Sequence, residues 1–290
     1  MDIRTQITEG RLDAALSATE LAVQANPLDF RSRTTLFTLL SFTGQYERAQ
    51  QQLTVLGQEN AEAASGVTVY RSLLEASLRR DRVLRGEESP QYLLQPPPYA
   101  AAQETLLHRL AAGDFAEARQ AVDYIAAERP PVWVRCGAHS GSLSDADDRV
   151  AAVAELFLQD RYVWLPWEQI RSLHIPRPQQ LRDLLWTPVD IALDVGQLRA
   201  FMPVLYPGSE GSPDPLVRLG RMSVWRDNDF GLSLGMGARL LSLGPTTEMA
   251  EATDIPLLEV GNLLRLGEFG EDLPFSDPEL PMSPPLASAG

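Results

Sequence analysis

The chain has 290 residues, a formal net charge of -14 and 44% apolar residues, which is enough for two modest domains with cores of their own. An acidic surface repels phosphate backbones and anionic lipid headgroups, so we expect no nucleic-acid partner and no membrane partner. The single cysteine, Cys136, excludes an internal disulfide, and the N-terminus has no unbroken apolar run. We therefore expect a cytoplasmic protein without a signal peptide or a membrane span.

Three segments near the N-terminus share a pattern: a glycine, an apolar residue two positions later and an alanine five positions later. They begin at Gly10, Gly44 and Gly113, so their separations of 34 and 69 residues are about one and two periods. The glycine allows a tight turn between helices, and the small alanine allows their close approach. Tetratricopeptide repeats, which are helix pairs, have a period of 34. Residues 1–130 are predicted to form a short array of such pairs, although alanine-rich helices also produce this pattern by chance.

The leading helices of these pairs are expected at residues 28–43, 67–85 and 99–112. Repeats of this kind use the inner face of their leading helices as a groove for a peptide or helix. Mapping the repeat onto the first and third of these helices predicts a protein-binding surface, which consists of Arg31, Thr34, Thr38, Ser41, Phe42, Gln103, Leu107 and Leu110. The alternative is that the C-terminal half of the chain packs over these side chains.

After residue 130 the pattern changes to short apolar runs separated by glycine and proline. Ser144 and the aspartates after it are typical of a helix start, so we expect a helix at residues 146–158. A shorter helix is expected at 179–185. Strands are predicted at 161–165, 170–175, 189–193, 199–204, 217–225, 231–243 and 256–264. Together they indicate an α+β protein, in which residues 131–266 form a mainly antiparallel sheet or small barrel.

The last segment, residues 267–290, contains five acidic residues, five prolines and no basic residue. Such a composition cannot bury enough apolar surface to offset the entropy lost on folding. We expect this acidic, proline-rich tail to be disordered.

Residues with catalytic chemistry are sparse. Cys136 and His139 are three positions apart and would allow a thiol–imidazole hydrolase, but the segment reads more simply as a loop. The aspartates at 145, 147 and 148 could bind a divalent cation, although helix capping explains them better. The Gly-Met-Gly at 235–237 lacks the spacing and the lysine of a phosphate loop and is more typical of a strand bulge or of a close backbone approach. We expect no catalytic, cofactor or metal site.

The aromatic-rich run RYVWLPWEQI begins at Arg161. Strand alternation places Tyr162 and Trp164 on one face and Val163 and Leu165 on the other. Most of these rings are expected in the core, and part of the set is a candidate protein-binding patch.

Four segments taken together resemble the ImpE family, also called TagJ, of bacterial type VI secretion accessory components. They are GRLDAALSATELAVQANPLDFRSRTTLFTLLSFTGQYERAQQQLTVLG, DADDRVAAVAELFLQDRYVWLPWEQIRSLHI, LRDLLWTPVDIAL and VLYPGSEGSPD. The resemblance covers about residues 10–265, and the combination of segments is more specific than any one of them.

The resemblance implies a cytoplasmic, non-catalytic role in the sheath cycle of the secretion machine. It implies binding to an N-terminal helix of the small sheath subunit, and an indirect link to the AAA+ ATPase that disassembles the sheath. A chaperone-like or regulatory adaptor for another protein is the alternative interpretation of the helix pairs. The two interpretations differ in partner but share the expectation of a groove that binds a peptide or helix.

Overall fold

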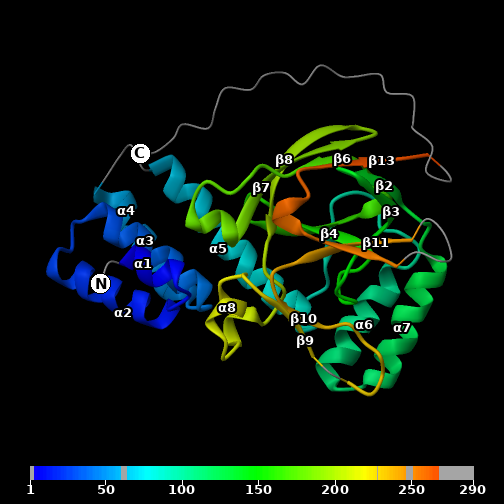
Figure 1. Ribbon diagram of the computed structural model, residues 1–290, viewed down its shortest axis with the longest axis horizontal. Coiled ribbons are helices and arrows are strands. Elements are labelled where there is room, and N and C mark those ends of the chain that lie inside the picture. Colours follow the sequence, from blue (N-terminus) through cyan, green and yellow to red (C-terminus); the bar gives the residue numbers. More distant parts are fainter. Residues whose placement is uncertain (1–2, 60–63, 227, 246–250, 268–290) are drawn as a thin grey trace.

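The computed structural model describes residues 3–59, 64–226, 228–245 and 251–267, and it shows an α+β fold (Figure 1). Helices occupy most of the chain before residue 130, and a large sheet dominates the rest. The predicted tail lies outside the described residues from position 268 onward. No helix within the described residues is long and apolar enough to cross a membrane.

In the helical half, the first five described helices pack one on the next, and the last two pack on each other. Its helices are α1 (Ile3–Thr8), α2 (Leu12–Ala25), α3 (Phe30–Phe42), α4 (Tyr46–Glu59), α5 (Ala64–Leu84), α6 (Ala100–Ala112) and α7 (Phe115–Glu128). The leading helices predicted from the repeat correspond to α3, α5 and α6, with ends that differ by three residues or fewer. The helix pairs α1–α2, α3–α4 and α6–α7 each begin their second helix just after a repeat glycine.

The three repeat glycines have the backbone conformation that the pattern predicts. Gly10, Gly44 and Gly113 have φ angles of 77°, 67° and 78°, in the left-handed region that is unfavourable for residues with a Cβ atom. Gly113 is the C-cap of α6, and its N–H donates to carbonyl oxygens of the last helical turn. The tight turns between paired helices therefore depend on these positions.

The sheet contains eleven strands among the described residues, in the order β1-β5-β4-β8-β7-β6-β13-β2-β3-β11-β12. Every neighbouring pair is antiparallel except β1–β5, so the prediction of a mainly antiparallel sheet is confirmed. The strands are β1 (Gln91–Tyr92), β2 (Trp133–Cys136), β3 (His139–Asp145), β4 (Val153–Leu158), β5 (Arg161–Pro166), β6 (Ile170–His174), β7 (Trp186–Leu193), β8 (Gly196–Pro203), β11 (Leu240–Gly244), β12 (Thr253–Pro256) and β13 (Asn262–Arg265). A separate hairpin pairs β9 (Ser223–Trp225) with β10 (Gly235–Gly237).

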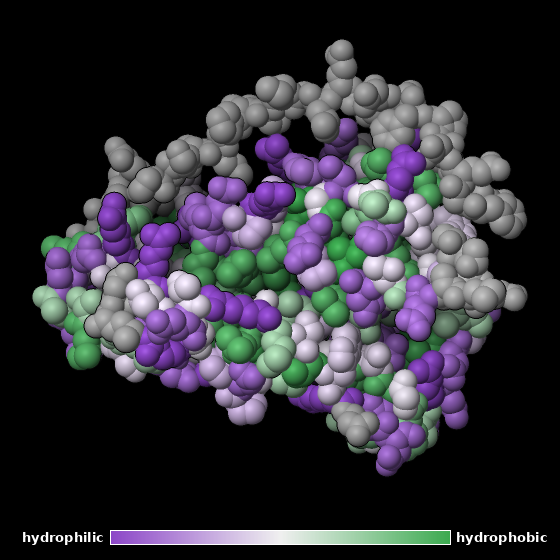
Figure 2. Space-filling view, viewed as in Figure 1, coloured by the Kyte–Doolittle hydropathy of each residue, from purple (hydrophilic) through white to green (hydrophobic). Residues whose placement is uncertain are grey.

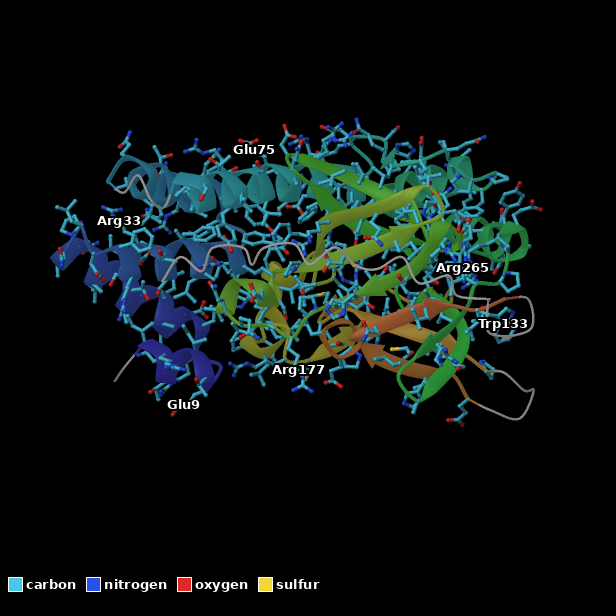
Figure 3. The ribbon with its side chains drawn as sticks, turned by 90° about the horizontal axis from the view of Figure 1, so that it is seen from above. Glu9, Arg33, Glu75, Trp133, Arg177 and Arg265 are labelled. Atoms are coloured by element: carbon cyan, nitrogen blue, oxygen red, sulfur yellow. The ribbon has the colours of Figure 1, made fainter. Side chains whose placement is uncertain are left out.

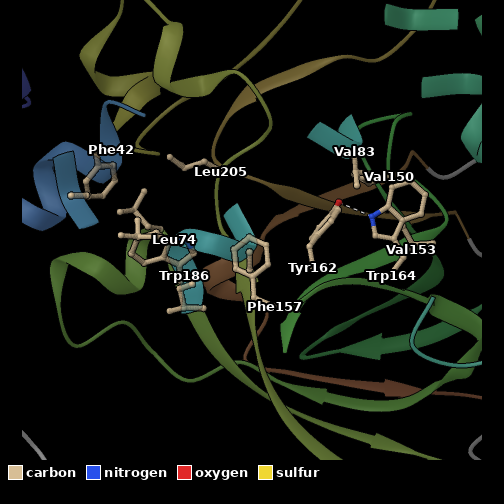
Figure 4. Packing of buried hydrophobic residues seen from close by; sticks show 14 of the residues in the cluster. Phe42, Leu74, Val83, Val150, Val153, Phe157, Tyr162, Trp164, Trp186 and Leu205 are labelled. Atoms are coloured by element: carbon tan, nitrogen blue, oxygen red, sulfur yellow. Dashed lines mark hydrogen bonds between the residues drawn. The ribbon is translucent and has the colours of Figure 1, made fainter. Parts of the chain in front are cut away.

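Alternation along β5 divides its side chains between two hydrophobic clusters, as predicted. Tyr162 and Trp164 belong to a cluster shared with the helices, whereas Val163 and Leu165 belong to a second cluster enclosed by the sheet. The first cluster includes residues from both halves of the chain, from Leu12 to Leu234. Figure 4 shows its central part, where side chains from helices and strands meet. The two halves are therefore joined by a common apolar core.

The prediction of a helix at residues 146–158 is wrong. Residues 153–158 form strand β4, which lies between β5 and β8 in the sheet. Asp145 is the last residue of β3, and Asp147 and Asp148 lie in the turn that follows it. Nearly every residue of β4 is buried, because one face packs on the helices and the other on the second cluster. An unbroken buried run has neither a helical nor a strand period, so it is ambiguous in sequence.

Three other differences concern local signals. The strand predicted at 217–225 begins instead with the short helix α8 (Pro215–Arg218), since Asp214 caps it and Pro215 occupies its first turn. The RCGAHSGS segment, interpreted as a loop, forms most of the β2–β3 hairpin. The helix expected at 179–185 is present as a 3-10 turn at Leu181–Leu184.

The helical end and the far edge of the sheet are at opposite ends of the molecule. Figure 3 places Glu9 and Arg33 at one end and Trp133 and Arg265 at the other. On the face shown in Figure 2, apolar side chains gather in the middle, between the first helices and the sheet, and hydrophilic ones predominate around them.

Candidate protein-binding groove

A groove of about 770 Å³ lies between α7 and the end of the sheet formed by β3, β11 and β12. We call it the α7 groove. Its walls and floor include Val122, Ala126, Ser144, Trp225, Ser242 and Asp254. A groove of this size with one helical wall has the form of a site that binds a protein segment.

The floor of the α7 groove is made of small polar side chains from three neighbouring strands. Ser242 of β11 pairs in register with Ser144 of β3 on one side and with Asp254 of β12 on the other. The alternate residues Leu143 and Leu241 point to the opposite face and are buried in the second cluster. Strand alternation therefore produces an apolar interior under a polar floor that does not obstruct a ligand backbone.

The wall opposite the sheet is the inner face of α7. Val122 and Ile125 are buried beneath the groove, and Ala126 is exposed along it. At the C-terminal end of α7, the Arg129 guanidinium donates to the carbonyl oxygens of Ala151 and Leu143 at 2.7 and 2.9 Å. These bonds hold α7 at a fixed position over the sheet, so the groove is preformed.

The lining of the groove includes an exposed aromatic side chain, Trp225, which is 40% accessible. Its ring packs on Tyr206, with centroids 5.6 Å apart. A Cβ at Gly235 would lie 2.6 Å from the Tyr206 ring and 2.8 Å from the Trp225 ring. The first glycine of Gly-Met-Gly therefore gives these rings their space, which confirms the interpretation of this motif as a close backbone approach.

The groove contains both signs of charge. Asp148 accepts from the backbone N–H of Ser233 at 2.7 Å, and burial raises the pKa of its carboxyl. Arg119 of α7 donates to Asp123 and to the carbonyl oxygen of Gly231. These contacts tie the segment after β9 to α7 and leave the groove without a strong field of one sign.

Beside the groove, a buried ionic network joins the helical half to the sheet. Glu155 of β4 is fully buried and accepts from Arg80 of α5 at 2.7 and 3.0 Å. It also accepts from the hydroxyl of Tyr162 and forms an ion pair with Arg239. Trp164 Nε1 donates to the Tyr162 hydroxyl at 2.6 Å, as Figure 4 shows. Each of these interactions is strengthened by burial, because the local dielectric constant is low.

The second half of the network lies under the groove floor. Arg239 is fully buried, lies 3.2 Å from Asp145, and has its pKa lowered to about 10 by burial. Burial also raises the pKa of Asp145 to about 6, although Arg239 opposes this shift. Asp147 accepts from Arg149 and from the Gly235 backbone N–H, which lies 2.7 Å away. The Asp-Ala-Asp motif therefore holds buried cations and a backbone turn instead of starting a helix.

A third connection is the segment 206–221, which contains the Tyr-Pro-Gly-Ser motif. It crosses the turns of the first two helix pairs, where a Cβ on Gly44 would lie 2.7 Å from Glu210 Cγ and one on Gly10 would lie 2.7 Å from Leu216 Cδ2. Arg218 donates to Asp13 of α2 at 2.6 and 2.8 Å. This segment, which we call the clamp, fixes the repeat turns against the sheet.

The structure divides the predicted protein-binding residues. Five are buried in the core of the chain, namely Thr38, Ser41, Phe42, Gln103 and Leu107. Arg31 is exposed, and Thr34 and Leu110 are half-buried. In addition, α3 lies among the first helices and α6 lies beside α7, so the eight residues do not share one surface (Figure 1). The sheet and clamp fill the space that the repeat pattern assigned to a ligand.

The α7 groove was missed because its floor comes from strands far apart in the chain, and the serines carry no periodic signal. The one available indication was the third repeat, whose second helix is α7. The other candidate residues have structural surroundings. Cys136 is buried, its Sγ donates to the Val260 carbonyl oxygen at 3.3 Å, and burial raises the pKa of its thiol. That shift is opposite to the one that activates a nucleophilic cysteine.

Comparisons with known proteins agree with this arrangement. The ImpE protein family matches residues 137–263. The type VI secretion system accessory component TagJ of Pseudomonas aeruginosa is 36% identical over 241 residues, which cover 82% of this chain and 84% of that protein. A crystal structure of a Vibrio parahaemolyticus protein has the same fold, with a TM-score of 0.83 at 23% identity, over 92% of this chain and 98% of that one. This chain therefore belongs to the ImpE family, together with the type VI secretion accessory component TagJ.

Proposed function

We propose that this protein is a non-catalytic adaptor of a type VI secretion system that binds the N-terminal helix of the small sheath subunit. The observation that carries the proposal is the 36% identity to TagJ across 82% of the chain. The adaptor acts in the cytoplasm, where it assists sheath assembly or recycling. Its link to the AAA+ disassembly ATPase is indirect, through the sheath subunit that both proteins handle.

The α7 groove is the proposed site for the partner helix. It is open and preformed, and its lining includes Trp225. An exposed aromatic side chain in a groove is a common anchor for protein partners. The buried members of the predicted surface would require the common core to open before they could touch a partner. Arg31, Thr34 and Leu110 remain accessible and define the competing site.

A non-catalytic role fits the way the polar residues are used. The buried carboxylates of the ionic network are matched by arginines, and the network holds two structural halves together. Among the described residues, no group of three His, Cys, Asp or Glu side chains is arranged to hold a metal ion. The Cys136 thiol is neither exposed nor acidified.

Two matched variants test the site. Ala126 lines the groove and Ala127, the next residue of α7, does not, and both side chains are exposed. Calorimetric titration with a peptide of the sheath subunit's N-terminal helix is expected to show binding by wild type and Ala127→Glu. Ala126→Glu fills the groove with a charge and is expected to weaken binding at least tenfold.

Two results would reverse these assignments. Binding lost in Arg31→Glu but kept in Ala126→Glu would move the site to the α3 face. A wild-type protein that fails to bind the helix, while it captures another protein of the secretion system, would favour the alternative of an adaptor for a different partner.

A further inference from the structure

We propose that the C-terminal segment 268–290 of this chain occupies the α7 groove and so competes with its partner. The competition rests on the proposed function, but occupancy of the groove by the segment does not. Three features of the described structure point to this occupant: the place where the fold ends, the chemistry of the groove and the composition of the segment.

The last described residues leave the fold next to the groove. The backbone N–H of Leu266 donates to the carbonyl oxygen of Trp133 at 2.7 Å, and Trp133 pairs in register with Ser142. Ser142 and Pro131, which lie on either side of Trp133, both line the α7 groove. With strands about 4.8 Å apart, Leu266 lies about 10 Å from Ser142. Figure 3 shows Trp133 and Arg265 at the same end of the molecule.

The segment is long enough to enter the groove from that point. An extended chain advances about 3.3 Å per residue, so three or four residues cover the distance to Ser142. The remaining residues, which include the run from Leu280 to Gly290, are then available to follow the groove along α7. Attachment to the same chain through residues 268–279 also makes the distal part a stronger competitor than its intrinsic affinity suggests.

The composition of the distal part matches the groove. The stretch 280–290 has no charged residue and contains three prolines with Leu280, Met282 and Leu286. Proline-rich segments bind in aromatic-lined grooves and lose little entropy when they do so. The α7 groove offers the half-exposed Trp225, the exposed Ala126 and a floor of serines.

The charges assign the two parts of the segment different places. All five acidic residues lie in its first part, residues 268–279. The groove contains Asp148 and Asp254 beside Arg119, so an uncharged stretch fits inside it better than an acidic one. The acidic part therefore spans the exit from the fold, and the uncharged part is the occupant.

The effective concentration of a short tethered ligand is in the millimolar range. If the free peptide binds with a dissociation constant of about 100 µM, the groove is occupied about ten times more often than it is empty. Disabling the segment is then expected to raise the affinity for a competing helix about tenfold.

The test uses the full chain with Leu280, Met282 and Leu286 replaced by serine, changes that touch no described element. A fluorescent peptide of residues 268–290 is titrated into this variant and into wild type, and anisotropy is read. The variant is expected to bind the peptide with a dissociation constant near 100 µM, and wild type about tenfold more weakly because its groove is filled. Adding Ala126→Glu to the variant should abolish binding, whereas adding Ala127→Glu should not.

A lack of saturable peptide binding below 1 mM would overturn the proposal, and so would binding that persists with Ala126→Glu. A control peptide with the same three serine substitutions is expected not to bind. No sheath protein takes part in these titrations. Failure of the proposed function, seen as no binding of the sheath helix, is therefore distinguishable from failure of this inference.

Discussion

The ionic network around Glu155 makes a quantitative prediction about how the two halves are held together. Glu155→Gln keeps the size of the side chain but removes its charge, so Arg80 and Arg239 lose their shared anion in a site where both are buried. Removing one partner of a buried ion pair costs about 3–5 kcal/mol, because the remaining charge is left uncompensated. We expect a loss of that size in the free energy of unfolding.

The assay is urea denaturation followed by tryptophan fluorescence. Trp164 donates to Tyr162, which donates to Glu155, so the signal includes a reporter of the network. Asp190→Asn is the control, since its pair with Arg199 has side chains 43% and 59% exposed. An exposed pair contributes less than about 1 kcal/mol. Adding Arg80→Met to Glu155→Gln should cost less than the sum of the single changes. If Glu155→Gln lowers the free energy of unfolding by less than 1 kcal/mol, the network does not hold the two halves together.

Two further predictions concern the stability of the fold. Burial raises the pKa of Asp81 to about 6, above its value of 3.8 in the unfolded chain, so its contribution to stability declines as pH rises between those values. Asp81→Asn should therefore raise the free energy of unfolding by about 1–2 kcal/mol at pH 7.5, a figure reduced to allow for the partial exposure of the side chain, and by about half as much at pH 5. An equal gain in stability at the two pH values would contradict this cause. Gly237→Ala should destabilise the protein by more than about 3 kcal/mol, since its Cβ would lie 1.9 Å from the Met222 carbonyl oxygen. Gly113→Ala, with the same left-handed backbone but open space, should cost only about 1–2 kcal/mol, and equal losses would show that the contact is unimportant.

Local signals were sufficient for the helical half. The repeat glycines, the small alanines and the apolar stripes predicted α3, α5 and α6 to within three residues, because each signal acts within one helix pair. Strand β5 was predicted for the same reason, since its alternation is visible in five residues. The family resemblance was likewise recognisable in sequence, because its motifs are contiguous.

What sequence did not predict depends on contacts between distant segments. Asp145 and Asp147 resemble a helix start until Arg239 and the Gly235 turn, about ninety positions later, are placed against them. Phe42 resembles an accessible groove residue until the sheet and clamp cover it. The groove floor needs strands β3, β11 and β12 in register, which no local pattern specifies.

The groove between α7 and the sheet is the proposed site of the partner helix. Hydrogen exchange of the full chain with Leu280, Met282 and Leu286 replaced by serine, measured with and without the N-terminal helix of the small sheath subunit, tests it most directly. Exchange is expected to slow in residues 119–129 of α7 and in residues 142–146 at the end of β3, with no change in α3. Protection confined to α3 and the neighbouring first helices, with α7 unchanged, would contradict it.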